Sequence, residues 1–363
     1  MKNVLGNNLT ITLFGESHGA AIGAVLDGLA PGMDVDLDFI NSMLSKRRPQ
    51  GSISTARREQ DELQILSGVF EGKTTGTPLC IVIKNNDTMS KDYSATRYLA
   101  RPSHADYTAA CKYHGFEDYR GGGHFSGRIT AALVAAGAVV IPALEKKGIK
   151  IATHIANIGG ICDRSFENLE ADIAALNGAD FAVLDKNQGE KMQQKILAAK
   201  ADGDSVGGVL ETVICGLPAG VGEPWFDTVE GLLSHALFSI PAIKGVEFGA
   251  GFGLANMTGS AANDAFYIAD GKVATKTNNS GGINGGITNG MPVNFRCAVR
   301  PTPTLSREQN TVDMKNLTDA VLASKGRHDP CIVHRARVVV DCVCALVIAD
   351  ILSGRFGTDW LGA

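Results

Sequence analysis

The most strongly apolar part of the chain is an alanine-rich run over residues 129–144, bounded by Arg128 and Glu145. A helix that crosses a membrane needs about 20 apolar residues, so this run is too short. A helix that is apolar on every side has to be covered on every side. The run therefore predicts a core helix that packs between two covering layers.

Helical periodicity recurs along the chain, and many of these segments are followed by glycine, a common helix stop. In one of them, Asp227 and Glu230 have the spacing of a capping box, with Asp in place of Ser or Thr. The predicted helices are 36–47, 57–67, 105–114, 130–147, 165–176, 186–201, 228–238, 312–324 and 342–352.

Short runs rich in β-branched residues lie between the predicted helices. Since strands and helices do not alternate regularly, the pattern favours an α+β fold built in layers over a doubly wound sheet. No low-complexity linker divides the chain, although its length fits either two domains or one extended unit. The predicted strands are 9–14, 79–84, 208–214, 246–248, 293–299 and 332–340.

Composition narrows the classes of partner. The chain of 363 residues has a net charge of -4 and a pI near 6.1, which argues against a nucleic-acid or anionic-membrane partner. Its 8 cysteines include no Cys-x-x-Cys pair, and Cys342 and Cys344 face different ways on a predicted helix. We expect reduced thiols, no metal site, no signal peptide and a cytoplasmic location.

Two nucleotide-binding motifs nearly occur, and both fail. Gly68, Gly72 and Lys73 imitate a P-loop, but only three residues separate the glycines and a helix is predicted before them. Gly249 and Gly251 follow a strand, but the third glycine of the Rossmann spacing is missing. We therefore expect neither an ATPase nor a pyridine-nucleotide domain.

Four polar segments place histidine or arginine beside small residues. Side chains that exchange protons near neutral pH lie next to guanidinium charges, and the glycines let backbone N–H groups approach a ligand closely. The segments are far apart in sequence, so only folding brings them together. Together they predict a site for a phosphorylated anion. They are 15–19, 101–108, 121–128 and 326–330.

Taken singly, each segment also fits a purely structural interpretation. Ser17 and His18 directly follow a predicted strand and fit either a site or a capped turn. His104 follows an Arg-Pro pair and fits either a site residue or a helix cap. The glycines 121–123 precede the buried helix, where free N–H groups suit phosphate, but they also fit a flexible loop.

In these segments the chain resembles the chorismate synthase family, which has them in the same order. The resemblance covers nearly the whole chain and implies a single catalytic domain over residues 1–363. It also implies antiparallel sheets that enclose a helical layer, a β-α-β sandwich with an internal pseudo-repeat. Further matches at similar spacing are 54–55, 57–59, 66–72, 75–78, 239–247, 281–287 and 300–304.

The resemblance implies a lyase that converts 5-enolpyruvylshikimate 3-phosphate to chorismate and phosphate by a 1,4-elimination. This is the last common step toward the aromatic amino acids, and the family needs reduced FMN for it. A substrate with two carboxylates and a phosphate requires several guanidinium groups to bind it. Loss of a ring proton and of an anion requires proton donors and acceptors at separate points.

The resemblance also implies roles for individual residues. His18 would protonate the leaving phosphate, His104 would protonate the anionic reduced flavin, and Ser17 and Asp329 would lie near flavin N5. The substrate-binding residues would be Arg48, Arg101, Ser126, Arg128 and Arg327. The flavin-binding residues would be Arg47, His124, Phe125, Ser126, Pro241, Ala242, Gly285, Arg300, Pro301, Thr302, Pro303, Thr304 and Arg327.

The chain departs from the family pattern in two places. The loop 47–51 is one residue shorter than is common, which weakens the expectation of its usual contacts, including any with a nicotinamide nucleotide. The string His-Phe-Ser-Gly-Arg at 124–128 replaces a frequent Arg-Ser-Ser-Ala-Arg, so one positive charge is lost while Ser126 and Arg128 are kept.

Partners follow from the resemblance and from the failed motifs. Without a Rossmann fingerprint, the chain is expected to need an external flavin reductase, with NADPH only as an indirect electron source. The family suggests a homotetramer. Two other functions stay open from the residues alone: a phosphotransferase acting on a sugar phosphate, and a non-catalytic flavin or phosphate sensor that would not need His18, His104 and Asp329 together.

Overall fold

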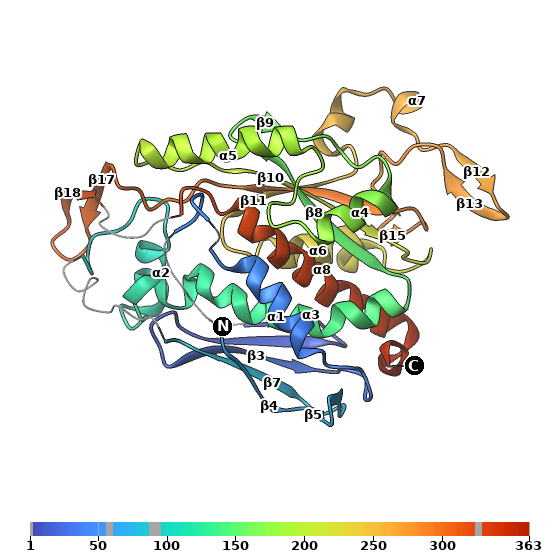
Figure 1. Cartoon of the computed structure of the whole chain (residues 1–363), viewed down its shortest axis with the longest axis horizontal. Coiled ribbons are helices and arrows are strands. Elements are labelled where there is room, and N and C mark those ends of the chain that lie inside the picture. The colour runs from blue at the N-terminus through green and yellow to red at the C-terminus, as the bar shows by residue number, and fades with distance from the viewer. Residues whose placement is uncertain (1–2, 50, 56–60, 87–95, 324–328, 363) are drawn as a thin grey trace.

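Two five-stranded antiparallel sheets enclose a layer of helices in this computed structural model (Figure 1). It describes residues 3–49, 51–55, 61–86, 96–323 and 329–362. The first sheet has the order β1 (Val4–Leu5), β2 (Thr10–Gly15), β3 (Ala21–Asp27), β7 (Leu79–Lys84), β4 (Leu63–Ser67). The second has the order β11 (Ile243–Phe248), β16 (Val293–Val299), β10 (Gly208–Cys215), β8 (Lys150–Ile158), β9 (Ile161–Cys162).

The two halves of the chain repeat one order of elements. Apart from inserted segments, the first half runs β2, β3, α1 (Leu37–Arg47), β4, β7, α3 (Thr130–Lys146). The second half runs β8, β10, α6 (Val229–Leu237), β11, β16, α8 (Val333–Phe356). In each sheet these four strands lie in the order first, second, fourth, third. The structure thus shows the β-α-β sandwich and the pseudo-repeat that the family resemblance implies.

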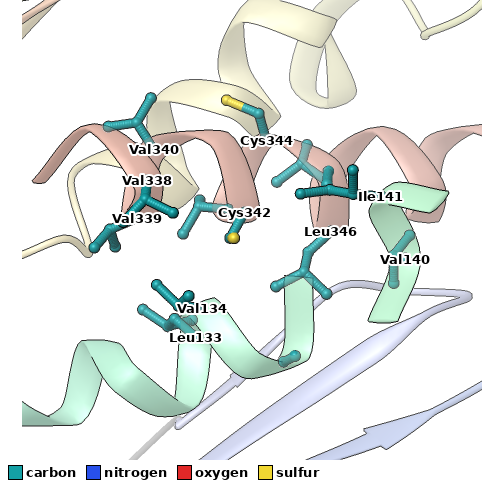
Figure 2. Close-up of a cluster of buried hydrophobic side chains, with 14 of the residues drawn as sticks. Leu133, Val134, Val140, Ile141, Val338, Val339, Val340, Cys342, Cys344 and Leu346 are labelled. Carbon is teal, nitrogen blue, oxygen red and sulfur yellow. The ribbon is translucent and has the colours of Figure 1, made fainter. Parts of the chain in front are cut away.

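The helices α3 and α8 form the centre of the middle layer. The first sheet packs on α3, the second packs on α8, and the two helices pack on each other, so apolar residues are buried on every side of both. Figure 2 shows this contact. A methyl group added at Gly137 would lie 2.4 Å from Cβ of Cys342, so glycine permits the close crossing.

The predicted core helix over 129–144 is confirmed. The segment Gly127–Lys146 has the length and composition to cross a membrane, but 89% of its most apolar window is buried inside the protein. On α8, Cys342 and Cys344 point to different sides of the helix (Figure 2). Burial raises the pKa of both thiols well above the ordinary value.

The helix predicted over 57–67 is wrong. The structure has β4 from Leu63 to Ser67, and residues 56–60 lie outside the described part of the chain. Leu63 and Ile65 are partly buried while Gln64 is exposed, and this alternation is the period of a strand. Since a strand precedes Gly68, the P-loop comparison fails on the glycine spacing alone.

Two further predicted elements are wrong. The predicted helix 312–324 is wrong: residues 312–323 belong to the hairpin of β17 (Glu308–Asp313) and β18 (Thr318–Ala323), and residue 324 lies outside the described part of the chain. Asp313 stabilises the turn by accepting hydrogen bonds from the backbone N–H groups of Lys315 (2.8 Å) and Asn316 (3.0 Å). Residues 333–340 of the predicted strand 332–340 form the first part of α8, because packing in the middle layer outweighs the strand preference of the valines.

The remaining elements lie outside the sandwich. The helices α4 and α5 pack on β8, and the hairpins β17–β18 and β12–β13 project at opposite ends (Figure 1). These elements are α2 (Asp106–Tyr113), α4 (Leu169–Asn177), α5 (Lys186–Ala201), α7 (Gly259–Ala262), β5 (Val69–Phe70), β6 (Lys73–Thr74), β12 (Phe266–Ala269), β13 (Lys272–Thr275), β14 (Ile283–Asn284) and β15 (Ile287–Thr288). The 3-10 turns are η2 (Arg120–Phe125), η3 (Gly127–Ile129), η4 (Trp225–Asp227), η5 (Gly251–Asn256) and η6 (Thr358–Leu361).

Candidate active site

The glycine loop 121–123, just before α3, brings the first three polar segments together. Its glycines all have positive φ, at 58°, 86° and 53°. A Cβ added at Gly121 would lie 2.2 Å from Cε1 of His18, and one at Gly122 would lie 3.1 Å from Cε1 of His104. The two histidines therefore pack on successive glycines, and a side chain at either position would push one of them away.

Ser17 fixes the orientation of His18. The Ser17 hydroxyl lies 3.2 Å from Nδ1 of His18 and 3.2 Å from the carbonyl oxygens of both Arg120 and Gly121. The hydroxyl has one hydrogen, so when it donates to a carbonyl its oxygen accepts from Nδ1–H of His18. Ser17 thus contacts Nδ1 of this buried imidazole and leaves Nε2 as the ring nitrogen that it does not touch.

His104 belongs to a compact ion-pair group with Arg101 and Asp106. Asp106 accepts hydrogen bonds from Nε (2.8 Å) and Nη2 (2.6 Å) of Arg101, and its Oδ1 lies 3.1 Å from Nδ1 of His104. Burial alone would raise the pKa of Asp106, but the hydrogen bonds from Arg101 and His104 outweigh it and hold the pKa well below its ordinary value. The ion pair leaves Nη1 as the guanidinium nitrogen of Arg101 that can face a substrate.

The segment after the glycine loop contains the next predicted residues. Nδ1–H of His124 donates to the carbonyl oxygen of Gly15 at 2.7 Å, which leaves Nε2 as an acceptor in the neutral ring. The ring of Phe125 packs edge-on against Tyr113 of α2, with 6.1 Å between centroids. The Ser126 hydroxyl caps the turn that leads into α3.

Three of the predicted arginines surround one carboxylate, that of Asp61. Its Oδ2 lies 3.4 Å from Nη2 of Arg47 and 3.3 Å from Nε of Arg48, and its Oδ1 contacts Nη1 of Arg128. The Asp61 side chain is completely buried, and its backbone has a positive φ of 49°. We call these four residues the arginine cluster. Burial raises the pKa of Asp61, but Arg47 and Arg128 outweigh it, so the pKa is lowered.

Asn85, directly after β7, joins the arginine cluster to the first polar segment. Its Nδ2 donates to the carbonyl oxygens of Glu16 and Gly19, both at 2.9 Å. Its Oδ1 accepts from Nε of Arg128 at 3.1 Å. One amide side chain thus holds both the loop that carries His18 and a guanidinium group predicted to bind substrate.

Asp329, from the fourth segment, also connects to the arginine cluster. It accepts from the backbone N–H of Thr55 at 2.9 Å and forms an ion pair with Arg335. Nε of Arg335 donates to the carbonyl oxygen of Arg47 at 2.7 Å. Within the described residues, no hydrogen bond joins Asp329 to Ser17. Arg327 lies outside the described part of the chain.

The predicted flavin segments at 241–242 and 300–304 lie close to Pro330, a described residue of the fourth polar segment. The backbone N–H of Arg300 donates to the carbonyl oxygen of Ala242 at 3.0 Å. The adjacent residues Ser205 and Val206 donate to the carbonyl oxygens of Thr302 (2.7 Å) and Pro330 (2.9 Å), respectively. This places the segment 300–304 near Pro330, the residue that follows Asp329.

Two polar atoms in this region fit a ligand. Nε of Arg300 and Oγ1 of Thr302 are buried, and neither has a hydrogen-bond partner among the described residues. A buried donor without a partner is costly, so these atoms favour a group that bonds to them when bound. A hydrogen-bonding ring such as a flavin meets that need.

Gly285 lies apart from the other predicted residues. It is in the turn between β14 and β15, and this turn packs on the start of α6 through a hydrogen bond from Val229 to the carbonyl oxygen of Gly286 at 3.0 Å. Among the described residues, no hydrogen bond or ion pair joins this turn to the histidines or to the arginine cluster.

Sequence reasoning missed Asp61, Asn85, Asp106 and Arg335. Asp106 stands inside a predicted segment, and Asn85 directly follows a predicted strand, so both had a positional signal. Asp61 and Arg335 each stand among other charged or polar residues in the sequence. Nothing in their local pattern distinguishes them from residues on a solvated surface.

The fold is a β-α-β sandwich. Its candidate site is cationic, contains histidines and suits a phosphorylated anion. A sequence model described as chorismate synthase matches residues 9–352. Proteins named chorismate synthase from Thermococcus kodakarensis and Pyrococcus abyssi are 45% and 46% identical to the chain, and each alignment covers 96% of this chain and 97% of the relative.

A crystal structure of chorismate synthase superposes with a TM-score of 0.77 and 32% identity, over 98% of this chain and 94% of the other. The chain belongs to the chorismate synthase family. It is therefore an enzyme, a lyase of aromatic amino-acid biosynthesis.

Proposed function

We propose that the protein eliminates phosphate from 5-enolpyruvylshikimate 3-phosphate, with bound reduced FMN, and releases chorismate. The observation that carries this proposal is the packing of His18 and His104 on successive glycines of one loop, which continues into the arginine cluster. Two separately oriented imidazoles beside several guanidinium groups suit a reaction that moves protons and expels an anion.

Substrate binding would fall to Arg48, Arg101, Ser126, Arg128 and Arg327. Within the arginine cluster, three guanidinium groups gather around the carboxylate of Asp61. Guanidinium groups pair well with carboxylates and phosphates, so this grouping suits a ligand with two carboxylates and a phosphate. Arg47 is almost fully buried, and its positive charge would also favour the anionic ligand.

His18 would donate a proton from Nε2 to the departing phosphate, because Ser17 holds its Nδ1. His104 would protonate the anionic flavin through Nε2. Ser17 and Asp329 would form a proton relay near flavin N5. When bound, reduced FMN supplies an electron-rich ring and a basic N5. The residues that would hold it are Arg47, His124, Phe125, Ser126, Pro241, Ala242, Arg300, Pro301, Thr302, Pro303, Thr304 and Arg327. Gly285, which the resemblance also implies, lies apart from them in the turn between β14 and β15.

We also propose one catalytic domain over residues 1–363, a cytoplasmic location and assembly as a homotetramer. One hydrophobic core takes residues from both sheets and the helices between them, which supports a single domain.

Large apolar side chains are exposed on and near the projecting hairpin β12–β13, at Phe252, Phe266, Ile268 and Val273. Clustered exposed apolar groups favour association between copies, which sedimentation would measure.

Anaerobic incubation of the protein with chemically reduced FMN and 5-enolpyruvylshikimate 3-phosphate tests the function. We expect chorismate and phosphate in equal amounts, with no net oxidation of flavin. No product under these conditions would contradict the proposed function. A parallel reaction with oxidised FMN and NADPH alone should stay inactive until a flavin reductase is added, and rapid turnover without one would contradict the need for an external reductase.

Membership of a lyase family sets aside the phosphotransferase and the non-catalytic sensor.

A further inference from the structure

The loop 101–106, which carries His104, is closed by the single carboxylate of Asp106. Besides the guanidinium of Arg101, this carboxylate accepts from the backbone N–H of Arg101 at 2.9 Å. The loop contains a strained residue, since Ser103 has a positive φ of 57°. A strained backbone persists only where its surroundings hold it, and here the bonds to Asp106 do so.

The Asp106 carboxylate and the Arg101 guanidinium both contact the same nitrogen of the His104 ring. Nδ1 lies 3.1 Å from Oδ1 of Asp106 and 3.1 Å from Nη2 of Arg101. A protonated ring donates Nδ1–H to Asp106, and so does the neutral ring that keeps its proton on Nδ1. The other neutral ring accepts at Nδ1 from Arg101. All three states keep the ring in one orientation.

The orientation directs the second nitrogen into the site. Nε2 lies toward the glycine loop, 3.4 Å from the position of a Cβ at Gly122, and His18 packs on the preceding glycine. Among the described residues, the charged or titratable groups that contact His104 are Arg101 and Asp106 on its own segment, and His18 packs on the neighbouring glycine of the loop. Asp106 is the anion of this set and favours the protonated ring.

We propose that Asp106 is a positioning residue for His104, holding Nδ1 so that Nε2 faces the glycine loop and stabilising the protonated imidazole. The consequence for catalysis rests on the proposed function, because the proton on Nε2 is the one His104 would give to the flavin. The effect on the ring itself does not depend on that function.

Deuterium exchange at Cε1 of each of the 8 histidines, followed by mass spectrometry over a pH series, measures the protonation midpoint of each ring in the whole protein. We expect the midpoint of His104 to fall by about one pH unit in Asp106→Asn, since an opposite charge in contact shifts titration by about 1–3 units. The exposed His114, which follows the last residue of α2, should keep its midpoint and serves as an internal control.

Asp172→Asn is the matched control. Asp172 also forms a two-point ion pair, with Nη1 (3.1 Å) and Nη2 (2.5 Å) of Arg164, and it lies on α4 on the outer face of the second sheet. This variant should leave the His104 midpoint unchanged. Asp106→Glu keeps the charge and should retain most of the wild-type midpoint, which gives a second measurement if Asp106→Asn does not fold.

A folded Asp106→Asn with the wild-type midpoint would overturn the proposal, and so would an equal shift in Asp172→Asn or a shift in Asp106→Glu as large as in Asp106→Asn. With the proposed substrate, the kcat of both proteins should fall at high pH, and the fall should come about one pH unit lower in Asp106→Asn than in the wild type. If the wild type makes no chorismate while the His104 shift is observed, the proposed function fails and the role of Asp106 stands.

Discussion

Replacing His18 with alanine is expected to lower kcat for chorismate formation by about 10²- to 10⁴-fold, the usual contribution of a positioned general acid. The substrate KM should change little, because the arginines that bind the anion are untouched. His18→Gln should lose as much, since a glutamine amide donates a hydrogen bond but does not transfer a proton. Anaerobic stopped-flow assays with reduced FMN measure both constants.

The matched control for His18 is His235→Ala, on α6. His235 is exposed and lies in the last turn of that helix, so its removal should leave kcat unchanged. Unchanged turnover in His18→Ala under saturating reduced FMN would show that the assigned proton transfer is wrong.

Asp61→Asn is expected to destabilise the fold by about 3–5 kcal/mol and to abolish most activity. Removing one partner of a buried ion pair leaves charge uncompensated, and here Arg47 and Arg128 would lose their shared carboxylate inside the protein. Without the carboxylate the arginines would repel one another, so the guanidinium groups would no longer be held in place to bind the substrate. Chemical denaturation of both proteins at neutral pH measures the difference in the free energy of unfolding.

The pH dependence identifies the cause of that loss. Because the folded pKa of Asp61 is lowered, its stabilisation is fully present above its unfolded pKa of about 3.9 and is lost as the pH falls through the folded value. The gap between wild type and Asp61→Asn should therefore be constant near neutral pH and shrink in acid. A gap that does not change with pH down to the folded value would contradict an electrostatic origin.

Asp34→Asn is the control for Asp61. Asp34 also bridges two cations, Lys73 and Lys146, both at 2.6 Å, but its side chain is half exposed. Hydrogen bonds from Lys146 and Lys73 lower the pKa of Asp34 to about 2. Water screens an exposed pair, so this variant should be much less destabilised than Asp61→Asn.

Elements with a strong local pattern could be predicted from the sequence. The apolar run before Glu145 gave the core helix, and the run 293–299 gave a strand of the second sheet with the same bounds. The segment 332–340 was misjudged because its valines favour a strand, whereas packing against the sheet and α3 decides for a helix. Strands β3 and β8 were not predicted at all, since glycine in one and polar residues in the other interrupt the expected alternation.

The candidate site could be predicted only where residues are unusual in type or spacing. His18, His104 and the glycines 121–123 stand out locally, and the fold brings them together. The residues that orient them do not stand out. Asp61 contacts arginines from α1 and from the turn before α3, and such a contact between distant segments has no local signature.

The proposed function requires the flavin and the substrate to bind between the glycine loop and the segment 300–304. A crystal structure of the protein with oxidised FMN and 5-enolpyruvylshikimate 3-phosphate tests it most directly. We predict the isoalloxazine ring against 124–126 and 300–304, with Nε2 of His18 about 3 Å from the substrate phosphate and Nε2 of His104 about 3 Å from the flavin. A flavin bound elsewhere, or a substrate that touches neither histidine, would contradict the account.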